Sequence, residues 1–156
     1  MKLTALLIAA SLALATTPVF AADLVTAKNP QTVLDALTAA GYPGKLDKLG
    51  GGNPSIGITV AGEKAFIDFY DCADDNTDCL TLLFNVGLHF KNGTTLDKAN
   101  GWNSKEVTGR VWLNSDLDPI MDFSLTTGDG VSADVFNQNV ELFATKIGQL
   151  KTYFGM

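Results

Sequence analysis

Cys72 and Cys79 are the only two cysteines of the chain, and they enclose the acidic stretch CADDNTDC. Two thiols this close in sequence, with a strand-like run on either side, are typical of a disulfide across the mouth of a loop in an oxidising compartment. A redox-active pair or a metal site is the alternative. However, the spacing is not Cys-x-x-Cys, and acidic neighbours disfavour the reactive thiolate. We therefore predict a structural disulfide.

The same loop carries oxygen ligands of the kind that calcium prefers. Asp74, Asn76 and Asp78 follow the alternate spacing that opens an EF-hand loop. The pattern then fails, because Cys79 stands where the sharp turn needs glycine and Asn85 stands where the bidentate glutamate should be. We expect a solvated acidic loop, with no bound metal and no other cofactor.

Residues for catalysis do not form a recognisable set. His89 is the sole histidine, and it falls on a polar strand position typical of a surface or half-buried pairing residue. No Ser-His-Asp or Cys-His arrangement can be assembled around it. Trp102 and Asn103 are expected to be a packing anchor and a C-terminal helix cap, with a binding role as the alternative. The sequence predicts that the protein is not an enzyme.

The first residues have the pattern of an export signal. Lys2 supplies a positive start, residues 3–15 are apolar, and Val19-Phe20-Ala21 supplies small residues at the positions that a signal peptidase reads. We expect cleavage after Ala21 and a periplasmic or secreted bacterial protein. The apolar run is shorter than the roughly 20 residues of a spanning helix, and no second run follows, so no membrane anchor is expected.

Residues 22–156 are predicted to form a single domain of about 135 residues, large enough for one hydrophobic core. Loss of the signal removes one lysine and no acid, which changes the formal net charge from −6 to −7. A surface of this sign repels phosphate groups. Nucleic acid is therefore not expected as a partner.

The elements that position these residues follow from caps and periodicity. Asn29 and Pro30 open a first helix that Gly41 closes, and Ser132 caps a last helix with one strong apolar stripe. Strands are expected at residues 56–60, 65–70, 80–90, 110–113 and 120–125, with a short helix at residues 96–102. The order predicts an α+β domain with an antiparallel five-stranded sheet covered by helices.

Alternation along the strands separates two faces of this sheet. One face is uniformly apolar and should lie under the terminal helices. The other mixes polar and aromatic residues, and its polar members include Asp68, Asn85, Arg110, Asp122 and Ser124. On this mixed face we select a hypothetical partner-binding set: Phe66, Tyr70, Leu83 and Trp112. Coverage of this set by the short helix at residues 96–102 is the alternative.

Four short motifs resemble the YbjN family over nearly the whole chain after the signal. They are Asn29-Pro30-Gln31, Phe69-Tyr70-Asp71-Cys72 with Asp78-Cys79, Asn100-Gly101-Trp102-Asn103, and Asp118-Pro119. The resemblance implies a fold similar to type III secretion chaperones, in the order helix-β-β-β-helix-β-β-helix. It also implies a role in bacterial sensory transduction, without an established activity or catalytic residues.

Together these features favour a non-enzymatic, exported binding module, chaperone-like or regulatory. It would contact a protein partner, or a second copy of itself, through the mixed face of the sheet. One alternative is a small calcium-dependent enzyme built on the acidic loop from Asp71 to Asp78. Another is a structural component of the cell envelope.

Overall fold

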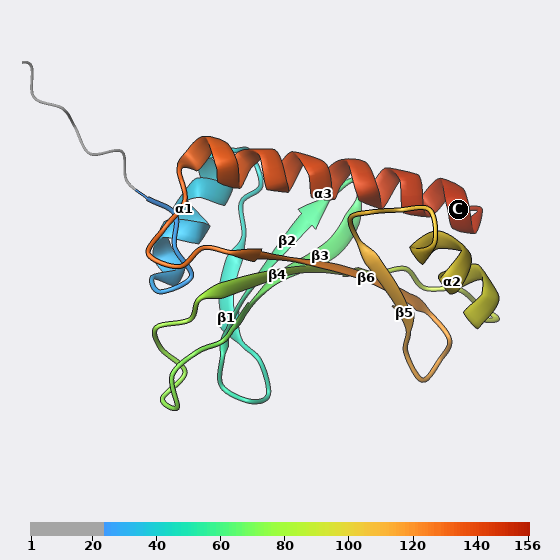
Figure 1. The fold of residues 1–156 in the computed structure, drawn as a ribbon, viewed down its shortest axis with the longest axis horizontal. Coiled ribbons are helices and arrows are strands. Elements are labelled where there is room, and N and C mark those ends of the chain that lie inside the picture. Colours follow the sequence, from blue (N-terminus) through green and yellow to red (C-terminus); the bar gives the residue numbers. More distant parts are fainter. Residues whose placement is uncertain (1–23) are drawn as a thin grey trace, which may run out of the picture.

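The computed structural model describes residues 24–156, so the expected export signal lies outside the described residues. The described chain forms a six-stranded sheet and three helices (Figure 1). In chain order they are α1 (Pro30–Ala39), β1 (Lys45–Lys48), β2 (Pro54–Val60), β3 (Glu63–Tyr70), β4 (Thr81–Gly87), α2 (Leu96–Asn103), β5 (Arg110–Leu113), β6 (Pro119–Thr126) and α3 (Ala133–Phe154). The predicted α+β class is confirmed.

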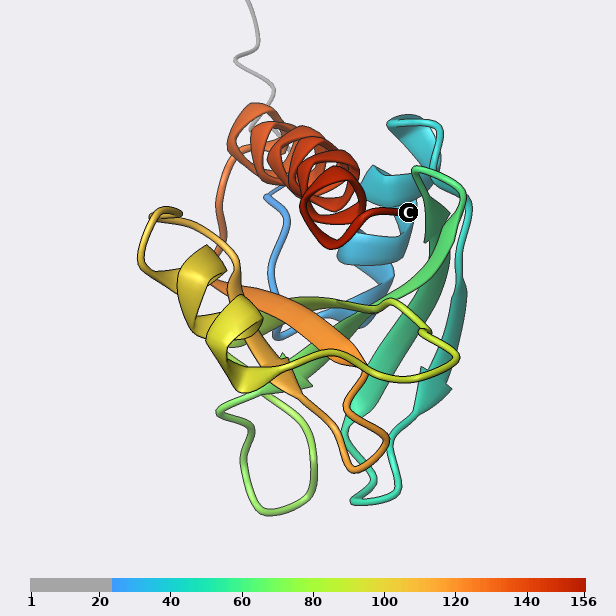
Figure 2. The ribbon, with the colours of Figure 1, turned by 90° about the vertical axis from the view of Figure 1, so that its right-hand side faces the viewer.

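The sheet is antiparallel throughout, in the order β1-β2-β3-β4-β6-β5. The helices α1 and α3 lie over one face, and α2 lies beside β5 at the C-terminal end of α3 (Figures 1 and 2). The opposite face, below the sheet in both views, carries no helix of the described chain. We call it the open face.

The sheet has six strands, and the prediction of five was wrong because it omitted β1. All four residues of β1 are exposed, and three of them are charged. A strand at the edge of a sheet can have both sides in water, so it lacks the alternation of buried and exposed residues that reveals inner strands. The strand expected over residues 80–90 is also shorter, since pairing with β6 ends at Gly87.

The predicted helix signals are confirmed. Asn29 accepts the amide of Gln31 at the start of α1, and Ser132 accepts the amide of Val135 at the start of α3. Gly155 ends α3 with φ of 85°, in the left-handed region that glycine adopts without strain.

The apolar stripe of α3 forms the centre of the core. All six stripe residues are buried: Phe136, Val140, Phe143, Ile147, Leu150 and Phe154. The ring of Phe143 meets the rings of Phe84 and Phe123 edge-on, at centroid distances of 5.6 and 5.7 Å. These two rings stack on each other at 4.9 Å across β4 and β6. Helix and sheet are therefore joined by one aromatic cluster.

Candidate contact surface on the open face of the sheet

The register of the strands decides which side chains meet on the open face. Phe66, Asn85, Asp122 and Arg110 lie in one row across β3, β4, β6 and β5. Asp68, Leu83 and Ser124 form the next row. The division into two faces made from sequence alternation places all of these residues correctly.

An aromatic pocket lies on the β5 half of this face. Its volume is about 440 Å³, and its walls are Tyr70, Thr81, Leu83, Arg110, Trp112 and Asp122. Tyr70 is 41% exposed and Trp112 is 44% exposed. Three members of the predicted partner-binding set, Tyr70, Leu83 and Trp112, are therefore brought together around one hollow.

Phe66 lies apart from the aromatic pocket. It lines a separate groove of about 570 Å³ on the β1–β3 part of the open face, with Lys45, Asp47 and Lys64 among its neighbours. The Nζ of Lys64 is 5.2 Å from the centre of the Phe66 ring, a cation–π contact. The open face therefore offers two hollows rather than one continuous aromatic patch.

A buried carboxylate fixes the aromatic pocket in place. Asp122 is only 6% exposed, and it accepts bonds from Nε and Nη2 of Arg110 at 3.1 and 2.9 Å. It also accepts the indole N–H of Trp112 at 2.8 Å. The bond to Asp122, followed by its charge, raises the pKa of Arg110 above its ordinary value. Sequence reasoning put Arg110 and Asp122 on this face, but their pairing needed the register of β5 on β6.

A second carboxylate lies further along the open face with neutral partners. Asp68 is 8% exposed and accepts the hydroxyl of Ser55 at 2.5 Å and the amide of Asn85 at 2.6 Å. Each oxygen has one donor, which lowers the free-energy cost of holding this carboxylate away from water.

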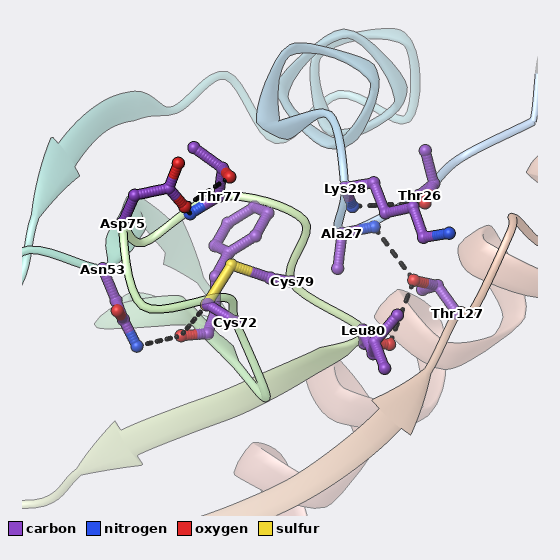
Figure 3. Close-up of a disulfide and its surroundings, with 11 residues drawn as sticks. Thr26, Ala27, Lys28, Asn53, Cys72, Asp75, Thr77, Cys79, Leu80 and Thr127 are labelled. Atoms are coloured by element: carbon purple, nitrogen blue, oxygen red, sulfur yellow. Dashed lines mark hydrogen bonds between the residues drawn. A yellow bond between two sulfur atoms is a disulfide. The ribbon is translucent and has the colours of Figure 1, made fainter.

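Cys72 and Cys79 are joined by a disulfide, with Cys79 almost fully buried at the end of the loop (Figure 3). The amide of Leu80 donates to the carbonyl of Tyr70, which continues the ladder of β3 and β4 to the loop (3.1 Å). The side-chain amide of Asn53 donates to the carbonyl of Phe69 (3.0 Å). The end of β3, just before the disulfide loop, is therefore held against the chain that joins β1 to β2.

The acidic residues of this loop are used in local turns. Asp75 accepts both the hydroxyl and the amide of Thr77, and these bonds lower the pKa of Asp75. Asn76 and Asp78 have φ of 65° and 49°, a left-handed backbone that these residue types tolerate. In the part of the chain from residue 24 onward, no three side chains of His, Cys, Asp or Glu gather in a way that could hold a metal ion.

His89 lies in a surface pair. Its side chain is 83% exposed, and its Nδ1 lies 2.8 Å from Oδ2 of Asp118. The other oxygen of Asp118 accepts the amide of Phe90 at 2.7 Å. That bond, followed by the bond and charge of His89, lowers the pKa of Asp118. The pair ties the end of β4 to the turn between β5 and β6.

The short helix α2 does not cover the open face. Trp102 is buried, donates its indole N–H to the carbonyl of Gly109 (2.7 Å) and meets the Tyr153 ring of α3 edge-on. Trp102 is thus the packing anchor that the sequence suggested. The expectation that Asn103 caps the helix was wrong, because Ser104 is the cap. The side chain of Asn103 instead forms hydrogen bonds with the backbone of Val111 in β5. These contacts hold α2 on the α3 side of the sheet.

The geometry defines a class of protein: a single-sheet α+β domain with helices on one face and a mixed aromatic and polar face left open. The sequence profile of the YbjN family, described as "Putative bacterial sensory transduction regulator", matches residues 29–156. The chain belongs to this family, and the predicted resemblance is confirmed.

A solved structure supports the fold. The "Crystal structure of YbjN, a putative transcription regulator from E. coli" superposes with a TM-score of 0.59 at 18% identity, covering 81% of this chain and 90% of that chain. At this identity the likeness establishes the fold alone. No curated protein sequence matches the chain. None of the helices in residues 24–156 is long and apolar enough to cross a membrane.

Proposed function

We propose that this chain is an exported, non-enzymatic binding module, chaperone-like or regulatory, that contacts a protein partner through the aromatic pocket of the open face. The observation that carries the proposal is the exposure of Trp112 and Tyr70 beside the apolar side chain of Leu83. Aromatic side chains in such hollows are the usual anchors of protein interfaces. Phe66, in the neighbouring groove, would extend the same contact.

The aromatic pocket is prepared for binding. Hydrogen bonds to Asp122 already hold the indole of Trp112 and the guanidinium of Arg110 in place, so neither side chain has to be ordered when a partner binds. Groups already fixed in their bound positions lose less conformational entropy on association. A preorganised aromatic anchor therefore favours a specific contact over non-specific association.

The family and the charge agree with a protein partner. The family is described as regulators of sensory transduction, and the E. coli relative as a regulator of transcription. Regulation of either kind can act through protein contacts. The formal net charge of −6 favours a protein partner over nucleic acid, because phosphate groups are repelled.

Export fits the disulfide. The signal pattern ending at Ala21 and the bond between Cys72 and Cys79 both indicate an oxidising compartment. We propose the periplasm or the extracellular space as the place where the partner is met.

Site-specific cross-linking tests the proposal. A photo-reactive amino acid is placed at Trp112 or Tyr70, and at Leu96 as a control, because Leu96 is 68% exposed but lies on α2. Irradiation in cells should give one discrete protein adduct at the two pocket positions, while the Leu96 control should not give it. Equal or absent adducts at the three positions would show that the aromatic pocket is not a contact surface.

A further inference from the structure

In the edge strand β1, the backbone N–H and C=O groups of every second residue point away from the sheet. Hydrogen-bonded and non-bonded positions alternate along an antiparallel pair. The amide of Leu49 donates to the carbonyl of Asn53 (2.8 Å), which makes the position just after β1 a bonded one. Counting back along the register, the backbone N–H and C=O groups of Leu46 and Lys48 point away from β2. Pro54, opposite Lys48, agrees with this pattern because it has no N–H to donate to β1. The outer edge of β1 thus presents backbone donors and acceptors.

On the other edge of the sheet, the outward backbone groups of Val111 already have hydrogen-bond partners. On β5, the side chain of Asn103 accepts the amide of Val111 at 2.8 Å and donates to its carbonyl at 2.9 Å, as a neighbouring strand would. Within residues 24–156, the outer edge of β1 has one comparable bond, from the amide of Lys48 to the carboxylate of Asp47 (2.9 Å). The two edges therefore differ, and β1 is the edge that can accept a strand.

The side chains of β1 are complementary to those of a second, antiparallel copy of β1. Lys45 and Asp47 share the open face with their partners on β2, and Leu46, 39% exposed, lies on the other side. When two copies run antiparallel about a two-fold axis at Leu46, each Lys45 lies opposite an Asp47. Leu46 then meets Leu46, and Lys48 lies opposite Gly44, which has no side chain.

Other symmetric registers are worse. An axis at Asp47 places the two Asp47 carboxylates directly opposite each other, which is destabilising. An axis between two residues pairs an outward backbone position with an inward one, so the ladder cannot form. Charge and backbone geometry therefore select the same arrangement.

We propose that β1 pairs with β1 of a second copy of this chain, antiparallel and centred on Leu46, so that the two sheets join into one. The amide of Lys48 leaves Asp47 and bonds Gly44 of the second copy, while Asp47 binds Lys45 of that copy. The β1 edge is at the far side of the sheet from Trp112, across four other strands, so the proposal does not depend on the aromatic pocket. About five residues from each chain take part, far fewer than the roughly 20 on each side of a stable interface, so the dimer is weak.

Sedimentation velocity on the protein with its disulfide intact tests this pairing, at concentrations from about 10 µM to about 1 mM. The wild type should show a reversible monomer–dimer equilibrium. Leu46→Pro removes the outward N–H and leaves the bonds to β2 in place, and it should weaken the dimer at least about tenfold with an unchanged fold by circular dichroism.

Charge exchange tests the register. Lys45→Asp should weaken the dimer about tenfold, since it replaces two attractive pairs by two repulsive ones. The double variant Lys45→Asp/Asp47→Lys should return to within about threefold of wild type, because the pairs are restored in reverse. Lys64→Asp on β3 changes the net charge by the same amount as Lys45→Asp, lies outside β1 and should change the equilibrium less than about twofold.

A cross-link gives an independent reading. The Cα atoms of the two Leu46 residues would lie about 5.5 Å apart, within the range for a disulfide. Leu46→Cys should form a covalent dimer on mild oxidation, and Asp47→Cys should not. A wild type that stays monomeric at the highest concentration overturns the proposal. So does self-association that survives Leu46→Pro or is lost instead in Trp112→Ala, or a charge exchange that restores nothing.

Discussion

The indole nitrogen of Trp112 lies 2.8 Å from Oδ2 of Asp122, so the most exposed aromatic of the open face is held by one of its most buried carboxylates. The same oxygen accepts Nη2 of Arg110 at 2.9 Å. Two side chains from β5 thus depend on one residue of β6. A change at Asp122 should therefore affect both the aromatic pocket and strand β5.

We expect Asp122→Asn to loosen this arrangement. An amide has one acceptor oxygen for three donors, and its own N–H₂ would face Arg110 or Trp112. The unfolding free energy should fall by about 1–2 kcal/mol, at the modest end because the guanidinium remains largely in water. Chemical denaturation measures the change, and Asp116→Asn in the exposed turn is the matched control. Equal midpoints for the two variants would contradict the structural role of Asp122.

Trp112→Ala should weaken binding of the cross-linked partner by about 2 kcal/mol or more, the usual loss for an aromatic anchor. The domain should stay folded, because Trp112 is not part of the core. Affinity is measured once cross-linking has identified the partner, and thermal melts of the same variant are recorded alongside. A lower melting temperature with unchanged affinity would assign Trp112 a structural role only.

Phe143→Ala should destabilise the domain by about 3–5 kcal/mol, since it removes the ring that joins α3 to Phe84 and Phe123. Most domains of this size would be largely unfolded by that loss. Urea denaturation gives the value, and Leu142→Ala, next to it but 37% exposed, should cost far less. Equal midpoints for the two variants would show that the stripe of α3 does not carry the core.

Mass spectrometry of the protein purified without reductant should show a mass two hydrogens below that of the dithiol form, as the bond between Cys72 and Cys79 requires. Replacing both by serine should cost on the order of 2.5 kcal/mol, the loop-entropy value for about eight residues. Full alkylation of both thiols without prior reduction would contradict the disulfide.

Asp118 should contribute to acid sensitivity. Its pKa is lowered in the folded protein, first by the amide of Phe90 and then by His89. A depressed carboxyl pKa stabilises the fold above the unfolded value of about 3.9 and loses this contribution as pH falls through the folded value. Melting temperatures between about pH 5 and pH 2 should fall less steeply in Asp118→Asn than in wild type. Parallel curves would exclude the contribution.

Much of the fold could be predicted because local signals were strong. The caps at Asn29 and Ser132, the stripe of α3 and the alternation along β3 and β4 each act within a few residues. Such signals do not depend on which distant segment lies alongside. They were sufficient to predict the α+β class and the two faces of the sheet.

The remaining features depend on pairing between distant segments. Asp122 could be assigned to a face but not to Arg110 and Trp112, because their meeting follows from the register of β5 on β6. Phe66 has the same alternation as Tyr70 yet lines a different groove, since the hollows are shaped by neighbouring strands. Asn103 had the composition of a helix cap, and only the packing of α2 against β5 gave it another role.

The segment that precedes α1 has a consequence for the order of folding. The amide and carbonyl of Val25 exchange hydrogen bonds with Val131, both at 2.9 Å, and the amide of Ala27 bonds the side chain of Thr127. The first described residues thus find these hydrogen-bond partners about one hundred positions later in the chain. During synthesis these residues have no partner until the chain is almost finished. The segment that contains Val25 and Ala27 therefore takes its place late in folding, because it waits for the residues that join β6 to α3.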